Sequence, residues 1–122
     1  MDPNLKNILW QQFGASIDML ENAVEACPAE VWNRESQFWY VAYHTIFYLD
    51  YYLSEEAENF TPPTPFTLSE LDASGLLPER VYTKDELVAY LKFGRQKCHD
   101  LIAGLNHRTC KKTFREQLHE LQ

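Results

Sequence analysis

The segment FWYVAYHTIFYLDYYL, residues 38–53, decides the fold. Eight of its first fifteen residues are aromatic, and no proline or glycine interrupts them. Apolar side chains recur every three or four positions on two adjoining sides, which predicts a helix over about residues 36–57. A helix that is apolar on more than one side packs on more than one side. The segment is therefore predicted to lie at the centre of a helical bundle.

A second long helix is predicted before this segment, over residues 3–27. Asp2 and Pro3 are typical of a helix start. Pro28 ends the helix, because the residue before a proline is pushed out of helical geometry. A short connector follows, and Trp32 is its predicted anchor in the core. The apolar stripe of the helix consists of Leu5, Ile8, Leu9, Phe13, Ile17, Leu20, Val24 and Cys27.

Residues 59–82 are predicted to form a long crossover, because prolines at its start and Gly75 and Pro78 later on break helical structure. A third helix is predicted to begin after Thr83, since Thr83 and Glu86 have the spacing of a capping box. Residues 106–122 carry four Lys and Arg against two Glu and keep only a thin apolar stripe. They are predicted to form a short, weak helical tail.

These elements predict one domain with an all-α fold. We expect an antiparallel up-down helical bundle with three long helices, a long crossover loop and a shortened fourth helix. The bundle core is predicted to occupy residues 1–105, and residues 106–122 are the atypical C-terminal tail.

Composition excludes several functional classes. Eighteen Asp and Glu against eleven Lys and Arg give a net charge of −7, which disfavours nucleic-acid binding because phosphate contacts need a basic face. No apolar run reaches the roughly 18 residues of a membrane span, and no secretion signal is visible, so we expect a cytoplasmic protein. The three cysteines form no C-x-x-C pair. Cys27 and Cys98 are predicted to be buried, and Cys110 is the candidate for a reactive thiol.

His44 is the histidine with the most distinctive surroundings. It lies on one side of the predicted central helix with Tyr40, Tyr48 and Tyr51. A buried imidazole needs a partner for each nitrogen, so His44 is either a satisfied structural histidine or a metal ligand. A metal site would need further ligands from neighbouring helices. The other histidines, His99, His107 and His119, are predicted to be exposed.

Residues 9–13 (LWQQF) and 38–53 resemble the DinB-like superfamily, and the likeness extends through residues 65–68 (PFTL) and 82–87 (YTKDEL). The resemblance implies a four-helix bundle, often dimeric, with zinc or nickel held by three histidines. It also implies a metal-dependent hydrolase or a thiol S-transferase that uses a small thiol. In that family one ligand comes from the second helix, and His44 occupies its place.

The sequence departs from the family at the other two ligands. They form an H-x-x-x-H pair on the last long helix, and this chain has no such pair. We therefore expect an incomplete metal site, no tightly bound metal, and a non-catalytic homodimeric module. The alternative is a divalent-metal-dependent hydrolase or thiol S-transferase, with His44 as one ligand and Tyr40, Tyr48 and Tyr51 orienting the cofactor or substrate. No residue is assigned as catalytic, and the substrate is unknown.

Overall fold

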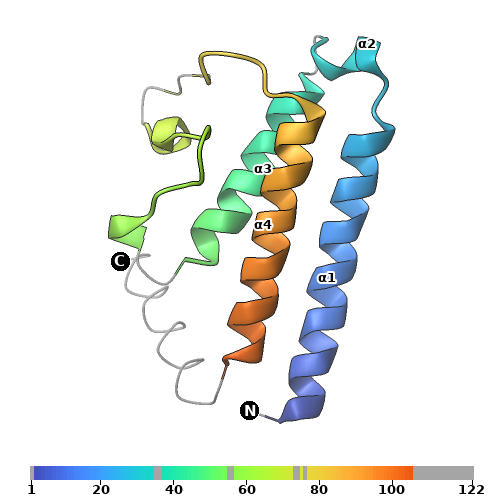
Figure 1. The fold of residues 1–122 in the computed structure, drawn as a ribbon, viewed down its shortest axis with the longest axis vertical. Coiled ribbons are helices and arrows are strands. Elements are labelled where there is room, and N and C mark those ends of the chain that lie inside the picture. The colour runs from blue at the N-terminus through green and yellow to red at the C-terminus, as the bar shows by residue number, and fades with distance from the viewer. Residues whose placement is uncertain (1, 35–36, 55–56, 73–74, 76, 106–122) are drawn as a thin grey trace.

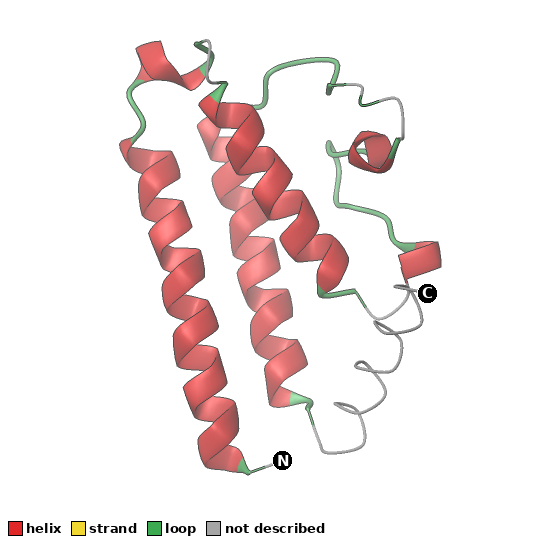
Figure 2. Cartoon of the chain, turned by 180° about the vertical axis from the view of Figure 1, so that it is seen from behind, coloured by secondary structure: helices red, strands yellow, loops and turns green. Residues whose placement is uncertain are grey.

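The computed structural model describes residues 2–34, 37–54, 57–72, 75 and 77–105, and within them it contains helices and no strand (Figure 2). The all-α prediction is therefore confirmed for this part of the chain. The elements in chain order are α1 (Pro3–Ala26), α2 (Ala29–Trp32), α3 (Phe38–Tyr52), the 3-10 turns η1 (Ala57–Asn59) and η2 (Leu68–Leu71), and α4 (Lys84–Ala103).

Three long helices lie side by side (Figure 1). Helix α4 packs against both α1 and α3, whereas α1 and α3 touch each other only lightly. Helix α1 runs opposite to the other two, and α3 and α4 run in the same direction. Residues between α3 and α4 carry the chain back to the end of the bundle where α3 began. A long crossover was expected here, but strict alternation of direction does not hold for α3 and α4.

Local chemistry sets the helix bounds. The Asp2 side chain accepts a hydrogen bond from the backbone N–H of Asn4 at the start of α1. Thr83 and Glu86 form the predicted capping box of α4. Helix α3 is shorter than the predicted 36–57. It begins after Gln37, whose φ of 48° is left-handed and cannot continue a right-handed helix.

Aromatic rings from the crossover and the helices form the centre of the core. Phe66, from the crossover, stacks on Tyr90 of α4 with ring centroids 4.2 Å apart. Tyr43 of α3 lies 4.9 Å from Tyr82. The indole N–H of Trp32 donates to the backbone carbonyl of Tyr82 at 2.9 Å, so Trp32 is buried and is the anchor that was predicted. The crossover is thus part of the core and not only a cover for it.

A buried polar cluster joins α3 to α4. Asp50 is 1% exposed and accepts from Lys97 Nζ at 2.6 Å and from the Tyr90 hydroxyl at 2.8 Å. Lys97 also donates to the Ser54 hydroxyl at 2.6 Å. The two helices approach closely beside this cluster, because a methyl group added to Gly94 would lie 3.2 Å from the Leu49 side chain.

The predicted apolar stripes are only partly buried. Ile17 and Val24 of α1 lie in the core, but Leu5, Ile8 and Phe13 on the same helix are exposed. Cys27 and Cys98 are buried, as predicted, and Cys110 lies outside the described residues. No helix in the described part of the chain combines the length and apolar character needed to cross a membrane.

Candidate functional site

Three side chains on one side of α3 converge on a single residue of the crossover. Tyr40, His44 and Tyr48 are four positions apart, so they lie one above the other on the helix. His44 Nδ1 lies 2.7 Å from Glu70 Oε2, and the Tyr40 hydroxyl donates to the same oxygen at 3.2 Å. The Tyr48 hydroxyl donates to the backbone carbonyl of Glu70 at 3.3 Å. We call these four residues the Glu70 cluster.

The crossover presents Glu70 because the residues that precede it are fixed. Phe60 and Phe66 are buried in the core, and they hold the crossover against α3. The Thr67 hydroxyl then accepts from the Ser69 backbone N–H at 3.3 Å and starts the 3-10 turn η2. This turn carries Glu70 to the Tyr40–Tyr48 side of α3. The Glu70 side chain is only 3% exposed as a result.

His44 is not a buried histidine, which corrects the structural alternative proposed from the sequence. Its side chain is 51% exposed, whereas its carboxylate partner is buried. A carboxylate oxygen accepts, so the contact with Glu70 assigns the ring hydrogen to Nδ1 and leaves Nε2 as the nitrogen that faces away from the carboxylate. Nε2 has no hydrogen-bond partner among the residues the structure describes. The Glu70 cluster thus holds one imidazole in a fixed tautomer at the surface.

The two tyrosines of the cluster are held as hydrogen-bond donors. Burial raises the pKa of the Tyr40 hydroxyl, and its hydrogen bond to Glu70 raises this pKa further. Burial and the Glu70 charge likewise raise the pKa of Tyr48. Both phenols therefore stay protonated at neutral pH. Their hydrogens point to Glu70 and help to keep its carboxylate in place.

Tyr51, the third tyrosine assigned to the site from the sequence, has a different environment. Its ring lies 5.4 Å from Phe60 and stacks parallel to Phe47 at 6.5 Å. The structure brings it within 6.2 Å of the Tyr48 ring, but it makes no contact with Glu70 among the interactions of the described residues. Tyr51 helps to seat the crossover on α3 rather than to form the cluster.

One oxygen of the cluster is buried without a partner. Oε1 of Glu70 has no hydrogen-bond partner within the described part of the chain. Burial raises the pKa of Tyr43, and the nearby phenol of Tyr82 adds to the effect. A buried polar group without a partner costs free energy and is uncommon in a purely structural core.

The described residues do not fit a three-histidine metal centre. Within them, no group of three or more His, Cys, Asp and Glu side chains could hold a metal ion. His99 is on α4, where its ring lies edge-on to Trp10 of α1 at 4.8 Å. His107 and His119 lie outside the described residues. Here the donor set at α3 is one imidazole, whose second nitrogen is occupied by Glu70.

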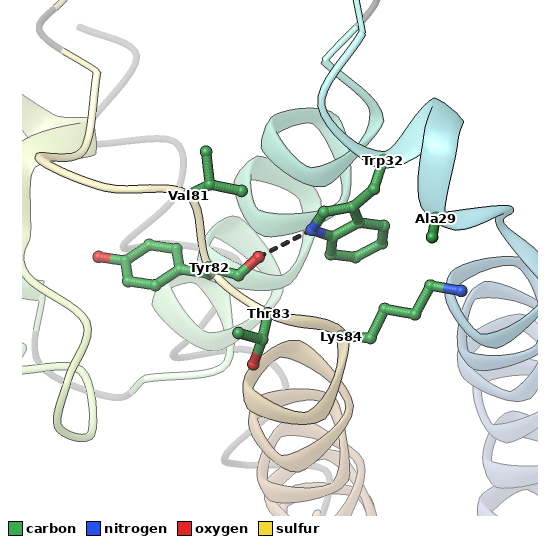
Figure 3. A pocket seen from close by; sticks show the side chains of 6 residues that line it. All are labelled: Ala29, Trp32, Val81, Tyr82, Thr83 and Lys84. Atoms are coloured by element: carbon green, nitrogen blue, oxygen red, sulfur yellow. Dashed lines mark hydrogen bonds between the residues drawn. The ribbon is translucent and has the colours of Figure 1, made fainter.

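A pocket of about 260 Å³ lies at the other end of the crossover, where it meets α2 and the start of α4 (Figure 3). Its walls are largely apolar, and its charged residue is Lys84, whose ammonium group donates to the backbone carbonyls of Glu25 and Cys27. Lys84 therefore caps the C-terminal end of α1. The lining residues are Ala29, Trp32, Val81, Tyr82, Thr83 and Lys84.

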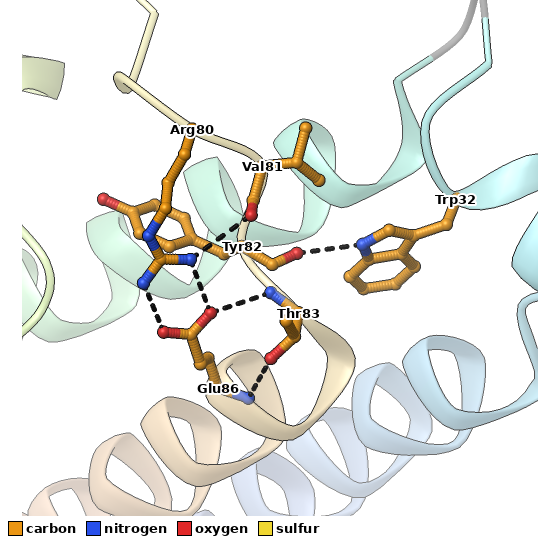
Figure 4. Close-up of polar contacts among 6 residues, drawn as sticks. All are labelled: Trp32, Arg80, Val81, Tyr82, Thr83 and Glu86. Atoms are coloured by element: carbon orange, nitrogen blue, oxygen red, sulfur yellow. Dashed lines mark hydrogen bonds and ion pairs between the residues drawn. The ribbon is translucent and has the colours of Figure 1, made fainter.

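The polar groups beside the pocket, like Lys84, form hydrogen bonds within the protein. Arg80 donates to both carboxylate oxygens of Glu86, and Glu86 accepts from the Thr83 backbone N–H (Figure 4). These contacts fix the start of α4. They also occupy most of the hydrogen-bond donors and acceptors that a ligand in the pocket could use. The Glu70 cluster is the stronger candidate site.

Glu70 is the site residue that sequence reasoning missed. It lies 26 residues from His44, in a segment predicted only as a crossover. The available signal was the pair Thr67 and Ser69, which can start a turn just before an acidic residue. That signal places Glu70 in a turn but gives no indication of its partner.

Comparison with known proteins adds no relative: no family model matches the chain, and neither the curated proteins nor the solved structures contain a significant match.

Proposed function

We propose that this protein is a DinB-like helical-bundle module that acts by association, as a homodimer, and does not use the family's three-histidine metal chemistry. The resemblance of residues 38–53 and the long crossover between α3 and α4 support the family assignment. The absent H-x-x-x-H pair supports the loss of metal chemistry.

The observation that carries the proposal is that His44 has no companion ligands in the described part of the chain. A family-type ligand would share its metal with two further imidazoles, but the other described histidine, His99, lies on α4 against Trp10 of α1. The described residues offer no further His, Cys, Asp or Glu side chains grouped for a metal. A single imidazole is a weak ligand, because tight zinc sites use three or four protein donors.

Association is supported by the surface of α1. Leu5, Ile8 and Met19 are exposed and share one face of the helix, since they are separated by three and eleven positions. We call this surface the α1 apolar face. We propose a second copy of the chain as the partner that covers these side chains.

A second candidate is a divalent-metal-dependent hydrolase or thiol S-transferase. The geometry that favours it is the Nδ1–Glu70 pair, because metal-binding histidines commonly donate their other ring N–H to a carboxylate. In that case His44 Nε2 would be one ligand, and the remaining ligands would come from outside the described residues or from a partner subunit.

Metal analysis distinguishes the two candidates. Protein produced in medium supplemented with zinc or nickel is measured by mass spectrometry for metal per chain, together with His44→Ala and the matched control His99→Ala. We expect well under one equivalent of metal in all three proteins. Stoichiometric metal that is lost in His44→Ala would contradict the proposal and support His44 as a metal ligand.

A further inference from the structure

The described part of the chain contains two equally accessible imidazoles with different carboxylate partners. The side chains of His44 and His99 are 51% and 49% exposed. His44 Nδ1 lies 2.7 Å from Glu70, whose side chain is buried, whereas His99 Nδ1 lies 3.4 Å from Asp100, whose side chain is 67% exposed. His99 can therefore serve as an internal reference for the effect of a buried carboxylate on the reactivity of His44.

A buried carboxylate on Nδ1 activates the other ring nitrogen. It fixes the tautomer that leaves a lone pair on Nε2, and it stabilises the positive charge that develops on the ring when Nε2 forms a bond. The effect is larger for Glu70 than for Asp100, because water screens an exposed charge far more than a buried one. Tyr40 and Tyr48 hold Glu70 in place through two further hydrogen bonds.

The surroundings of His44 favour an uncharged electrophile. The rings of Tyr40 and Tyr48 lie 6.0 and 4.8 Å from the imidazole and flank it with aromatic surface. Among the described residues, no lysine or arginine pairs with a member of the Glu70 cluster. A phosphoryl group would bring negative charge next to Glu70 with no cation to balance it, whereas a neutral acyl group would not.

We propose that His44 is a site of covalent acyl transfer, at which Nε2 accepts an acyl group from an activated donor such as an aryl ester or an anhydride. The Nε2 lone pair forms a bond to the carbonyl carbon, and the carbon–oxygen bond to the leaving group breaks and releases a phenolate or carboxylate. The ring then gives its Nδ1 proton to Glu70 or to solvent. Water later adds to the acyl carbon, releases the acid and restores the neutral imidazole.

This assignment goes beyond the proposed association role and needs neither a dimer nor a metal. Glu70 acts through His44 and is a positioning residue. Its contribution is therefore tested on the His44 rate with His99 as an internal control, because unfolding would also release His99 from Trp10 and change the His99 rate.

The test uses diethyl pyrocarbonate, an anhydride that carbethoxylates free imidazole nitrogens, with peptide-resolved mass spectrometry to follow each histidine. We expect His44 to react about ten-fold faster than His99, because a hydrogen bond to a charged group is worth enough free energy for that factor. In Glu70→Gln the His44 rate should fall close to that of His99, while the His99 rate stays unchanged. Tyr48→Phe, which keeps the carboxylate, should retain most of the difference.

A second arm uses p-nitrophenyl acetate, an aryl ester. Release of p-nitrophenolate should fall several-fold in His44→Gln and remain unchanged in His99→Gln. Equal carbethoxylation of His44 and His99 in the unmodified protein would overturn the proposal without any variant. An unchanged ratio of the His44 and His99 carbethoxylation rates in Glu70→Gln would overturn the role of Glu70. Faster modification of His44 by phosphoramidate than by the ester would overturn the choice of acyl donors.

Discussion

At the scale of single residues, α3 places an exposed histidine and a buried aspartate on different sides of the same helix. His44 faces the crossover and keeps half of its surface in solvent, whereas Asp50, six positions later, faces α4 and is fully buried. The sequence places His44 beside Tyr40 and Tyr48 correctly, because residues four apart share a helix face. It gives no sign of Glu70 or Lys97 as partners, since both are distant in sequence.

The Asp50 cluster makes a residue-scale prediction about stability. Asp50→Ala leaves the 27% exposed Lys97 without its carboxylate and removes the acceptor of the Tyr90 hydroxyl. We expect unfolding in urea to show a loss of about 2–3 kcal/mol. The matched control is Asp18→Ala, which removes an exposed pair with Arg95 and should cost less than about 1 kcal/mol. Equal losses in the two variants would show that the buried cluster adds no stability of its own.

At the scale of elements, the start of α4 is the most completely specified part of the chain. The sequence predicted the capping box, and the structure adds Arg80, which pairs with Glu86 and lies 5.0 Å from the centre of the Tyr82 ring. The Arg80 guanidinium, followed by the hydrogen bond from the Thr83 backbone, lowers the pKa of Glu86 to about 2. A local motif was enough to predict the cap, but the Arg80 contact depends on how the crossover enters the helix.

This lowered pKa predicts a pH dependence of stability. Because the folded pKa of Glu86 lies below its ordinary value of 4.5, the ionised carboxylate stabilises the fold above about pH 4.5, and the stabilisation is lost as the pH falls toward 2. The difference in unfolding free energy between the parent protein and Glu86→Gln should therefore shrink over this range. A difference that stays constant from pH 6 to pH 2.5 would contradict the assignment.

At the scale of the whole molecule, the aromatic core joins segments that no local pattern could pair. Phe66 of the crossover stacks on Tyr90, and Trp32 of α2 binds the backbone at Tyr82. The predicted long helices were found, although α3 ends at Tyr52 and not near residue 57, whereas the strict up-down order was wrong for α3 and α4. Periodicity specifies a helix and its apolar side, but the direction of the next helix depends on the path of the crossover.

The α1 apolar face gives the whole-molecule prediction. Sedimentation equilibrium at micromolar concentration should show a homodimer. Ile8→Glu combined with Met19→Glu should convert it to a monomer, because charges would be buried in the interface. Val41→Glu, at an exposed apolar residue of α3, is the matched control and should leave the dimer intact. A stable monomer of the parent protein would contradict the proposed association.

The sequence by itself determined the three long helices, the α4 cap, the crossover, the burial of Cys27 and Cys98, and the position of His44 beside its tyrosines. These features can be predicted from apolar spacing and from capping and helix-breaking residues within a few positions along the chain. Only the tertiary structure decided that His44 would be paired with Glu70 at the surface and that α3 and α4 would run in parallel. The physical reason is that both depend on where a long connection settles once Phe60 and Phe66 enter the core, and that position is fixed by packing across the whole bundle.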